Sequence, residues 1–161
     1  MSDEKLISDI IEREGGEKQT NDPQDRGGRT EFGISEKSNP EAWKDGVVTR
    51  TEAEAIYRQR YIEGPGFDQL PERLKQVMVD FGVTSGPRIA TRTLQFILGI
   101  EQDGLMGSET RQAISGWDES SLVNLVVLER LRLIRRIVAK RPNQQKWYRG
   151  WVLRAVEFLV P

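Results

Sequence analysis

Residues 14–34 read EGGEKQTNDPQDRGGRTEFGI, and this polar, glycine-rich stretch sets the organisation of the chain. The glycines at positions 15 and 16 stand where a helix usually ends. Turn-forming residues dominate from residue 17 to residue 33, which predicts a loop or a small, irregular hairpin with little core of its own. Ahead of the stretch, Leu6, Ile7, Ile10 and Ile11 recur at helical spacing. Residues 3–14 are therefore expected to form a short amphipathic helix.

Helical patterns fill the chain after this stretch. Thr49 and Glu52 form a capping box ahead of a helix that should reach residue 63. A second helix should begin at Pro71 and end at Gly82 or Gly86, and a third should cover residues 88–98. The turn at residues 103–108 predicts Ser108 as the N-cap of a further helix.

The longest predicted helix runs from Asp118 to Arg141 and carries a broad apolar stripe. The stripe consists of Leu122, Leu125, Val126, Leu128, Leu131, Ile134 and Val138. Pro142 should end this helix, and a last helix should hold Trp147, Trp151, Leu153, Val156 and Leu159. No linker or repeat divides the chain. The expected fold is one mainly α domain over residues 1–161, with a small loop or hairpin region after the first helix.

The composition limits the chemistry that the chain can perform. Its 161 residues are 37% apolar and 30% charged, which is typical of a globular protein. There is no cysteine and no histidine, which excludes disulfides, zinc sites built on these residues, cysteine nucleophiles and Ser-His-Asp triads. Acid–base chemistry must then rest on carboxylates, tyrosine or lysine, and neither a metal nor a cofactor is expected.

The charge is unevenly distributed along the chain. The net charge is -1, but residues 111–161 carry 10 Lys and Arg against 4 Asp and Glu. The basic helix over residues 119–141 could contact a membrane surface or another anionic partner. A solvated helix face, whose apolar stripe packs in the core, explains the same residues, and no nucleic-acid recognition signature is present.

Glu14 is the candidate for acid–base chemistry. Cleavage of a glycosidic bond needs a protonated carboxyl group for the leaving oxygen and a second group that activates water or stabilises the oxocarbenium-like centre. The negative end of a helix dipole favours the protonated form of a carboxyl group, which is the form that a general acid needs. Asp22, Asp25 and Thr30 follow Glu14 in the loop. Position alone is also compatible with a solvated glutamate at a helix end.

An ordered set of short motifs extends from this stretch over most of the chain. They are Glu14-Gly15-Gly16, Asn21-Asp22-Pro23, Asp25 before Gly27-Gly28, Thr30 before Phe32-Gly33-Ile34, Ile56-Tyr57-Arg58, Asp80-Phe81, Ser85-Gly86, Asp103-Gly104 and Gly150-Trp151. Together they resemble the signature of the glycoside hydrolase family 108 muramidases. These are lysozyme-like enzymes that occur as phage endolysins and as bacterial secretion-associated lysozymes.

The resemblance implies a lysozyme-like fold. It implies a catalytic region over residues 1–86 and a C-terminal helical half over residues 87–161 that resembles a peptidoglycan-binding segment. The implied activity is hydrolysis of the β-1,4 bond between N-acetylmuramic acid and N-acetylglucosamine in peptidoglycan, with Glu14 as the general acid. A lytic transglycosylase and a non-catalytic cell-wall-binding module are the alternatives.

The resemblance also implies roles for other residues. Asp25 and Thr30 are the candidates to position or activate water, and Asp25 is preferred to Asp22 because it lies closer to Thr30. An Asx-turn residue and a structural hydroxyl are the alternatives for Asp25 and Thr30. Substrate contacts are expected from Asp22, Phe32, Asp80 and Ser85. The sequence departs from the family pattern at residues 17–20, where an aromatic residue is usual, at Arg26, which replaces proline, and at Thr84, which replaces asparagine.

Two further features have both a binding and a structural interpretation. Residues 94–113 look like a peptidoglycan-binding repeat, but a turn between two core helices explains the same residues. Trp43, Trp117, Trp147 and Trp151 could stack on sugar faces, although at helical spacing Trp147 and Trp151 are more typical of a core.

The N-terminus lacks the basic start and apolar stretch of a signal peptide. We therefore expect a monomer that stays in the host cytoplasm and reaches the cell wall after a holin opens the membrane.

Overall fold

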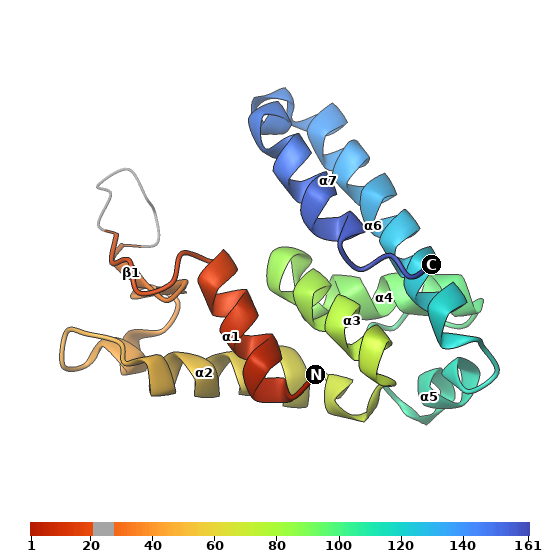
Figure 1. The fold of residues 1–161 in the computed structure, drawn as a ribbon, viewed down its shortest axis with the longest axis horizontal. Coiled ribbons are helices and arrows are strands. Elements are labelled where there is room, and N and C mark those ends of the chain that lie inside the picture. The colour runs from red at the N-terminus through yellow and green to blue at the C-terminus, as the bar shows by residue number, and fades with distance from the viewer. Residues whose placement is uncertain (21–27) are drawn as a thin grey trace. The chain divides into compact units, whose positions relative to one another are not determined.

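The computed structural model describes residues 1–20 and 28–161 (Figure 1). These residues form seven α-helices and one two-stranded antiparallel sheet, which confirms the predicted mainly α, lysozyme-like class with a small hairpin. They divide into two compact units, Met1–Arg60 and Tyr61–Pro161, and each unit is described by itself. None of the helices in the described ranges is long and apolar enough to cross a membrane.

In the first unit two helices pack against each other. Helix α1 spans Asp3–Arg13 and buries the four predicted apolar residues, Leu6, Ile7, Ile10 and Ile11. Helix α2 spans Arg50–Arg58, and the predicted capping box of Thr49 and Glu52 is present at its start. A 3-10 turn, η1, covers Pro40–Trp43, and a π-helical turn, η2, covers Gln59–Glu63.

The predicted hairpin lies between these helices in the chain. Strand β1, Thr30–Glu31, pairs with strand β2, Ile34–Ser35. The two residues that connect them, Phe32 and Gly33, have φ angles of 50° and 76°, as a tight type I′ hairpin turn requires. Thr20 extends the pairing, because its backbone bonds that of Thr30 in both directions at 2.9 Å.

Side-chain contacts stabilise the hairpin at the end opposite the turn. Arg29 forms an ion pair with Glu36 at 2.8 Å, and its guanidinium lies 4.9 Å from the ring centroid of Trp43. The hydrogen bond from Arg29 lowers the pKa of the Glu36 carboxyl. The indole N–H of Trp43 donates to the Ile34 carbonyl at 3.2 Å. The hairpin is thus fixed by one cation, one carboxylate and one buried ring.

The second unit is helical. Its elements are η3 (Phe67–Gln69), α3 (Glu72–Ser85), α4 (Pro87–Leu98), α5 (Ser108–Ile114), α6 (Glu119–Lys140), η4 (Pro142–Trp147) and α7 (Tyr148–Val156). Helix α3 packs against α4 and α6, and every residue from Val77 to Gly82 is buried. Helices α6 and α7 lie side by side as an antiparallel pair (Figure 1).

Four local predictions were wrong. Gly107, not Ser108, is the N-cap of α5. Leu128 of α6 is exposed, and Val123 and Val127 are buried in the stripe that was expected to include it. Trp147 lies in η4, before α7 begins, and is 54% exposed. The prediction that Trp147 belongs to a core helix was wrong because the chain makes a 3-10 turn after Pro142, which changes the helical register.

The fourth correction concerns Arg130, a cation of the basic helix over residues 119–141, which was expected to face solvent or a membrane surface. It is 3% exposed, and its guanidinium donates to the Asp80 carboxylate at 2.7 Å and to the Thr84 hydroxyl at 3.1 Å. A buried arginine needs a partner of opposite charge, and the partner here lies on another helix, 50 residues away in the chain.

Candidate active site

Glu14 caps the C-terminal end of α1 and is half-buried. Its backbone N–H donates to the carbonyls of Ile10 and Ile11 at 3.0 and 3.1 Å. Gly16 closes the helix with a bond from its N–H to the Ile11 carbonyl at 3.0 Å, and both glycines have positive φ angles. This is the bonding of a glycine-terminated helix. The Glu14-Gly15-Gly16 motif therefore places the glutamate at the hydrogen-bonded end of the helix.

The hairpin turn lies directly against Glu14. A Cβ atom added to Gly33 would lie 2.9 Å from the Glu14 Cβ and 2.4 Å from the Tyr57 hydroxyl oxygen. No side chain fits at such distances, so only glycine allows the turn to approach the glutamate this closely. The two motifs, 19 positions apart in the chain, thus meet at one place.

Two hydrogen bonds hold the turn in this position. The N–H of Phe32 donates to the Gly16 carbonyl at 3.1 Å. The hydroxyl of Tyr57 donates to the Phe32 carbonyl at 3.2 Å. The segment that ends α1, the hairpin turn and α2 all take part in these two bonds, so the surroundings of Glu14 depend on all three.

Tyr57 was missed as a site residue by sequence reasoning. It is buried on α2, four residues after the buried Ala53. That spacing marks it as a core residue, and a buried tyrosine hydroxyl usually has a hydrogen-bond partner. The sequence contains no signal that this partner is the hairpin turn.

The other residues predicted around Glu14 are placed as follows. Thr30 lies in β1, two positions before the turn, and is half-buried. Phe32 is buried in the turn itself, so its contribution to the site is its backbone rather than an open ring face. Asp22 and Asp25 lie outside the described residues.

Asp80 and Ser85 belong to the second unit. Asp80 is fully buried on α3, and its carboxylate pairs with Arg130 of α6 at 2.7 Å and with Arg154 of α7 at 2.8 Å. A glycan contact at Asp80 would require this ion cluster to open. Ser85 is the last residue of α3 and is half-buried.

Within residues 94–113 the buried polar side chains form hydrogen bonds that stabilise the turn at residues 103–108. The Gln95 side chain is buried; its amide donates to Asp103, to the Leu105 carbonyl and to Thr110, and its oxygen accepts the N–H of Gly104. Bonds from the Leu105 N–H and the Gln95 amide lower the pKa of Asp103. These contacts support the structural interpretation of the motif residues.

The four tryptophans differ in accessibility. Trp43 is buried under Arg29, Trp151 is half-buried, and Trp117 and Trp147 are exposed. Trp117 and Trp147 are therefore more accessible to a sugar than Trp43 and Trp151.

Comparison with known families agrees with the motifs. Residues 7–86 match the family glycosyl hydrolase 108, which covers Glu14, the hairpin and α3. The chain belongs to the glycosyl hydrolase 108 family. Residues 89–156 match a second family, described as a predicted peptidoglycan domain. No curated protein sequence matches the chain.

A solved structure is similar to this family member over almost the whole length of the chain. The SagA protein of Brucella abortus is 27% identical and superposes with a TM-score of 0.80, over 97% of this chain and 90% of that chain. The two family matches together identify the glycosyl hydrolase 108 member as a glycoside hydrolase that acts on peptidoglycan.

Proposed function

We propose that the chain is an N-acetylmuramidase that hydrolyses the β-1,4 bond between N-acetylmuramic acid and N-acetylglucosamine, with Glu14 as the general acid. The observation that supports this role is the contact between Glu14 and the hairpin turn at Gly33. A general acid must be held in one place relative to the leaving oxygen. The helix end and the turn hold the backbone and the Cβ atom of Glu14, from which its carboxyl group extends.

The second catalytic group is proposed from the order of the sequence. Asp25 is our first choice to position or activate water, and Thr30 is the second. Thr30 is tied to Thr20 and Ser35 through its backbone, so the pairing among the described residues uses its backbone and not its hydroxyl.

The test is a comparison of Glu14→Gln, Asp25→Asn and Thr30→Ala in a turbidity assay. Gram-negative cells with a permeabilised outer membrane are the substrate. Loss of a general acid should lower the rate by about 10²-fold or more, while circular dichroism stays that of the wild type. Glu17→Gln is the matched control, because Glu17 is exposed and follows the same helix. Full activity of Glu14→Gln would overturn the assignment.

Two alternatives have separate readouts. A lytic transglycosylase cuts the same bond with a single acid and leaves an anhydro end, so mass spectrometry of the released muropeptides separates it from a hydrolase by the mass of one water. A cell-wall-binding module would bind the cells without clearing them.

We also propose that the turn between α6 and α7 contacts an anionic surface, such as a membrane. This basic turn comprises Lys140, Arg141, Lys146 and Arg149, all exposed. No Asp or Glu occurs between residues 130 and 156, and the Lys146 ammonium lies 5.0 Å from the ring centroid of the exposed Trp147. Cations beside an exposed aromatic residue suit a membrane interface. The monomeric state and the role of a phage endolysin released by a holin stay predictions.

A further inference from the structure

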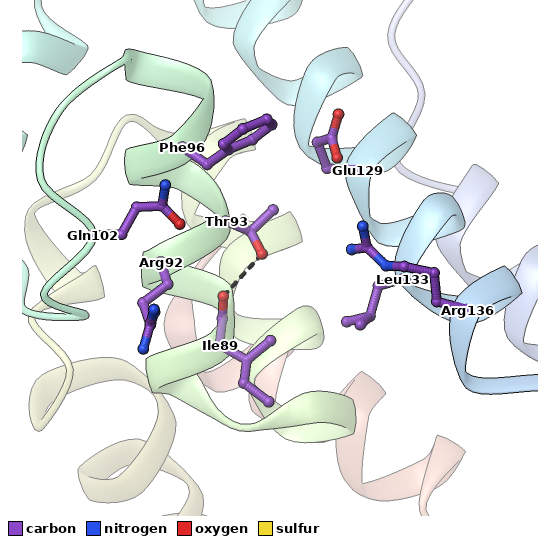
Figure 2. Close-up of a pocket in the computed structure, with 8 residues that line it drawn as sticks. All are labelled: Ile89, Arg92, Thr93, Phe96, Gln102, Glu129, Leu133 and Arg136. Atoms are coloured by element: carbon purple, nitrogen blue, oxygen red, sulfur yellow. Dashed lines mark hydrogen bonds between the residues drawn. The ribbon is translucent and has the colours of Figure 1, made fainter. Parts of the chain in front are cut away.

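A groove of about 390 Å³ lies between α4 and α6 in the second unit (Figure 2). Ile89, Arg92, Thr93 and Phe96 line it from α4, and Leu133 and Arg136 line it from α6. The α4 residues are spaced at i, i+3, i+4 and i+7, so they form one face of that helix. All of them fall within residues 89–156, the segment that matches a predicted peptidoglycan domain.

The apolar residues on this face of α4 are exposed and do not pack in the core. Ile89 is 45% exposed and Phe96 is 56% exposed, whereas the opposite face of α4 buries Ala90 and Leu94. Two large apolar side chains one above the other on an outward helix face make a patch of the kind that marks interaction surfaces. The patch is continued across the groove by Leu133 of α6 (Figure 2).

Cations stand at both sides of the patch. Figure 2 shows Arg92 on one side of α4 and Arg136 reaching from α6 on the other. Among the described residues neither guanidinium has a hydrogen-bond or ion-pair partner. The carboxylate of the groove, Glu129, is already paired with Arg132. The groove therefore presents two available guanidinium groups beside an apolar floor.

We propose that this groove binds the peptide stem of peptidoglycan, which rests on the proposed action of the chain on that polymer. The stem is a short peptide of small residues with free carboxylates, whereas the glycan strand is rich in neutral hydroxyl groups. Arg92 and Arg136 would donate paired hydrogen bonds to stem carboxylates, as guanidinium groups do. Ile89, Phe96 and Leu133 would cover the methyl groups of the alanines. The volume of the groove is that of a site for a small ligand.

The assignment separates two tasks in one chain. The glycan strand is cleaved at Glu14, and the stem is held at a groove in the other unit. Binding at the groove is expected to need the peptide but no glycosidic cleavage, so the two can be measured independently.

The test is a titration of ¹⁵N-labelled full-length protein with the stem tetrapeptide of Gram-negative peptidoglycan, followed by NMR. A peptide-free N-acetylglucosamine oligosaccharide is the counter-probe. We expect the tetrapeptide to shift the amides of α4 and α6 around the groove, and the oligosaccharide to leave them in place. The double variant Arg92→Ala/Arg136→Ala should raise the dissociation constant about tenfold, since it removes two solvent-exposed ion pairs with the stem carboxylates. Phe96→Ala should weaken binding as well.

The matched control is Arg73→Ala/Arg135→Ala, which removes the same charge from exposed positions outside the groove. Equal weakening by this control, or the absence of tetrapeptide-induced shifts at the groove, would overturn the proposal. So would burial of Phe96 by a second copy of the chain, seen as self-association that Phe96→Ala abolishes. If the wild-type protein binds the tetrapeptide but does not cleave glycan, the muramidase assignment is contradicted and the proposal that the groove binds the peptide stem is retained.

Discussion

Gly33 determines how closely the hairpin turn approaches Glu14. Its φ angle of 76° is one that glycine adopts without steric cost, and its missing side chain leaves the room that Glu14 and the Tyr57 hydroxyl occupy. Both properties are needed at this one position, so the glycine of the Phe32-Gly33-Ile34 motif is explained by the geometry of the site.

We expect Gly33→Ala to abolish muralytic activity and to lower the free energy of unfolding by about 1–3 kcal/mol, because it combines left-handed strain with a steric clash. Gly46→Ala is the control, since Gly46 also has a positive φ but a Cβ there would have only Arg29 nearby, at 3.8 Å. Activity assays and urea unfolding of the two variants separate the clash from the backbone strain. Equal losses in both would show that the contact with Glu14 has no role.

Tyr57→Phe removes the hydroxyl that donates to the Phe32 carbonyl. We expect unfolding to become easier by about 1 kcal/mol, as for one lost hydrogen bond, and the rate of cell clearing to fall because the turn is less well fixed. Tyr148→Phe, on the second unit, is the control. Unchanged activity of Tyr57→Phe at lower stability would assign this hydroxyl to folding alone.

At the scale of elements, one carboxylate joins three helices. Asp80 of α3 is paired with Arg130 of α6 and Arg154 of α7, and the first pair is almost fully buried. Removing one member of a buried ion cluster leaves the other members charged and without a partner. This lowers the free energy of unfolding more than replacing the whole cluster with apolar residues does.

Asp80→Asn is therefore expected to lower the free energy of unfolding by about 3–5 kcal/mol. Asp9→Asn breaks the exposed pair with Lys5 on α1 and should cost at most about 0.5 kcal/mol. Urea unfolding measures both. The triple variant Asp80→Leu/Arg130→Met/Arg154→Met, which removes all three charges, should recover part of the loss. A stability of Asp80→Asn close to that of Asp9→Asn would contradict a structural role for the cluster.

The helices could be predicted from the sequence because their signals are local. The spacing of Leu6 to Ile11 and the capping box of Thr49 and Glu52 are each contained within one or two turns. Ser108 was misassigned because serine and glycine both occur at N-caps, and they are adjacent here.

The contacts that complete the site and the core could not be predicted in this way. Tyr57 and Phe32 are 25 residues apart, and Arg154 and Asp80 are 74 apart. In neither pair does the sequence around one residue indicate which distant residue it will contact. Glu14 was proposed as the acid because its motif resembles that of a family, but the reason for the distant glycine at position 33 became visible only when both segments were seen together.

At the scale of the whole molecule, charge is distributed by unit. Residues 1–60 have a net charge of -4 and residues 61–161 one of +3. The exposed cations near the basic turn dominate the second value. Such an asymmetry attracts the positively charged unit to anionic surfaces. The attraction weakens as the salt concentration rises, because salt screens the charges.

Replacing Lys140, Arg141, Lys146 and Arg149 with glutamate should abolish binding to vesicles that contain anionic lipid, and should remove its salt dependence. Vesicle co-sedimentation at low and high salt is the measurement, with vesicles of neutral lipid as the reference. Because all four side chains are exposed, unfolding should change by less than about 0.5 kcal/mol per site. Wild-type binding that is the same to neutral and anionic vesicles would exclude an electrostatic contact.

The bridge between Thr20 and Thr30 has a consequence for protein engineering. Both ends of the intervening segment are pinned to each other by paired backbone bonds, and Glu14 is held by contacts outside it. The departures from the family pattern at residues 17–20 and at Arg26 fall in or beside this segment. Apart from Asp25, which the proposed catalysis needs, and Arg29, which pairs with Glu36, the residues of this segment should therefore be exchangeable between relatives while the acid stays in its place.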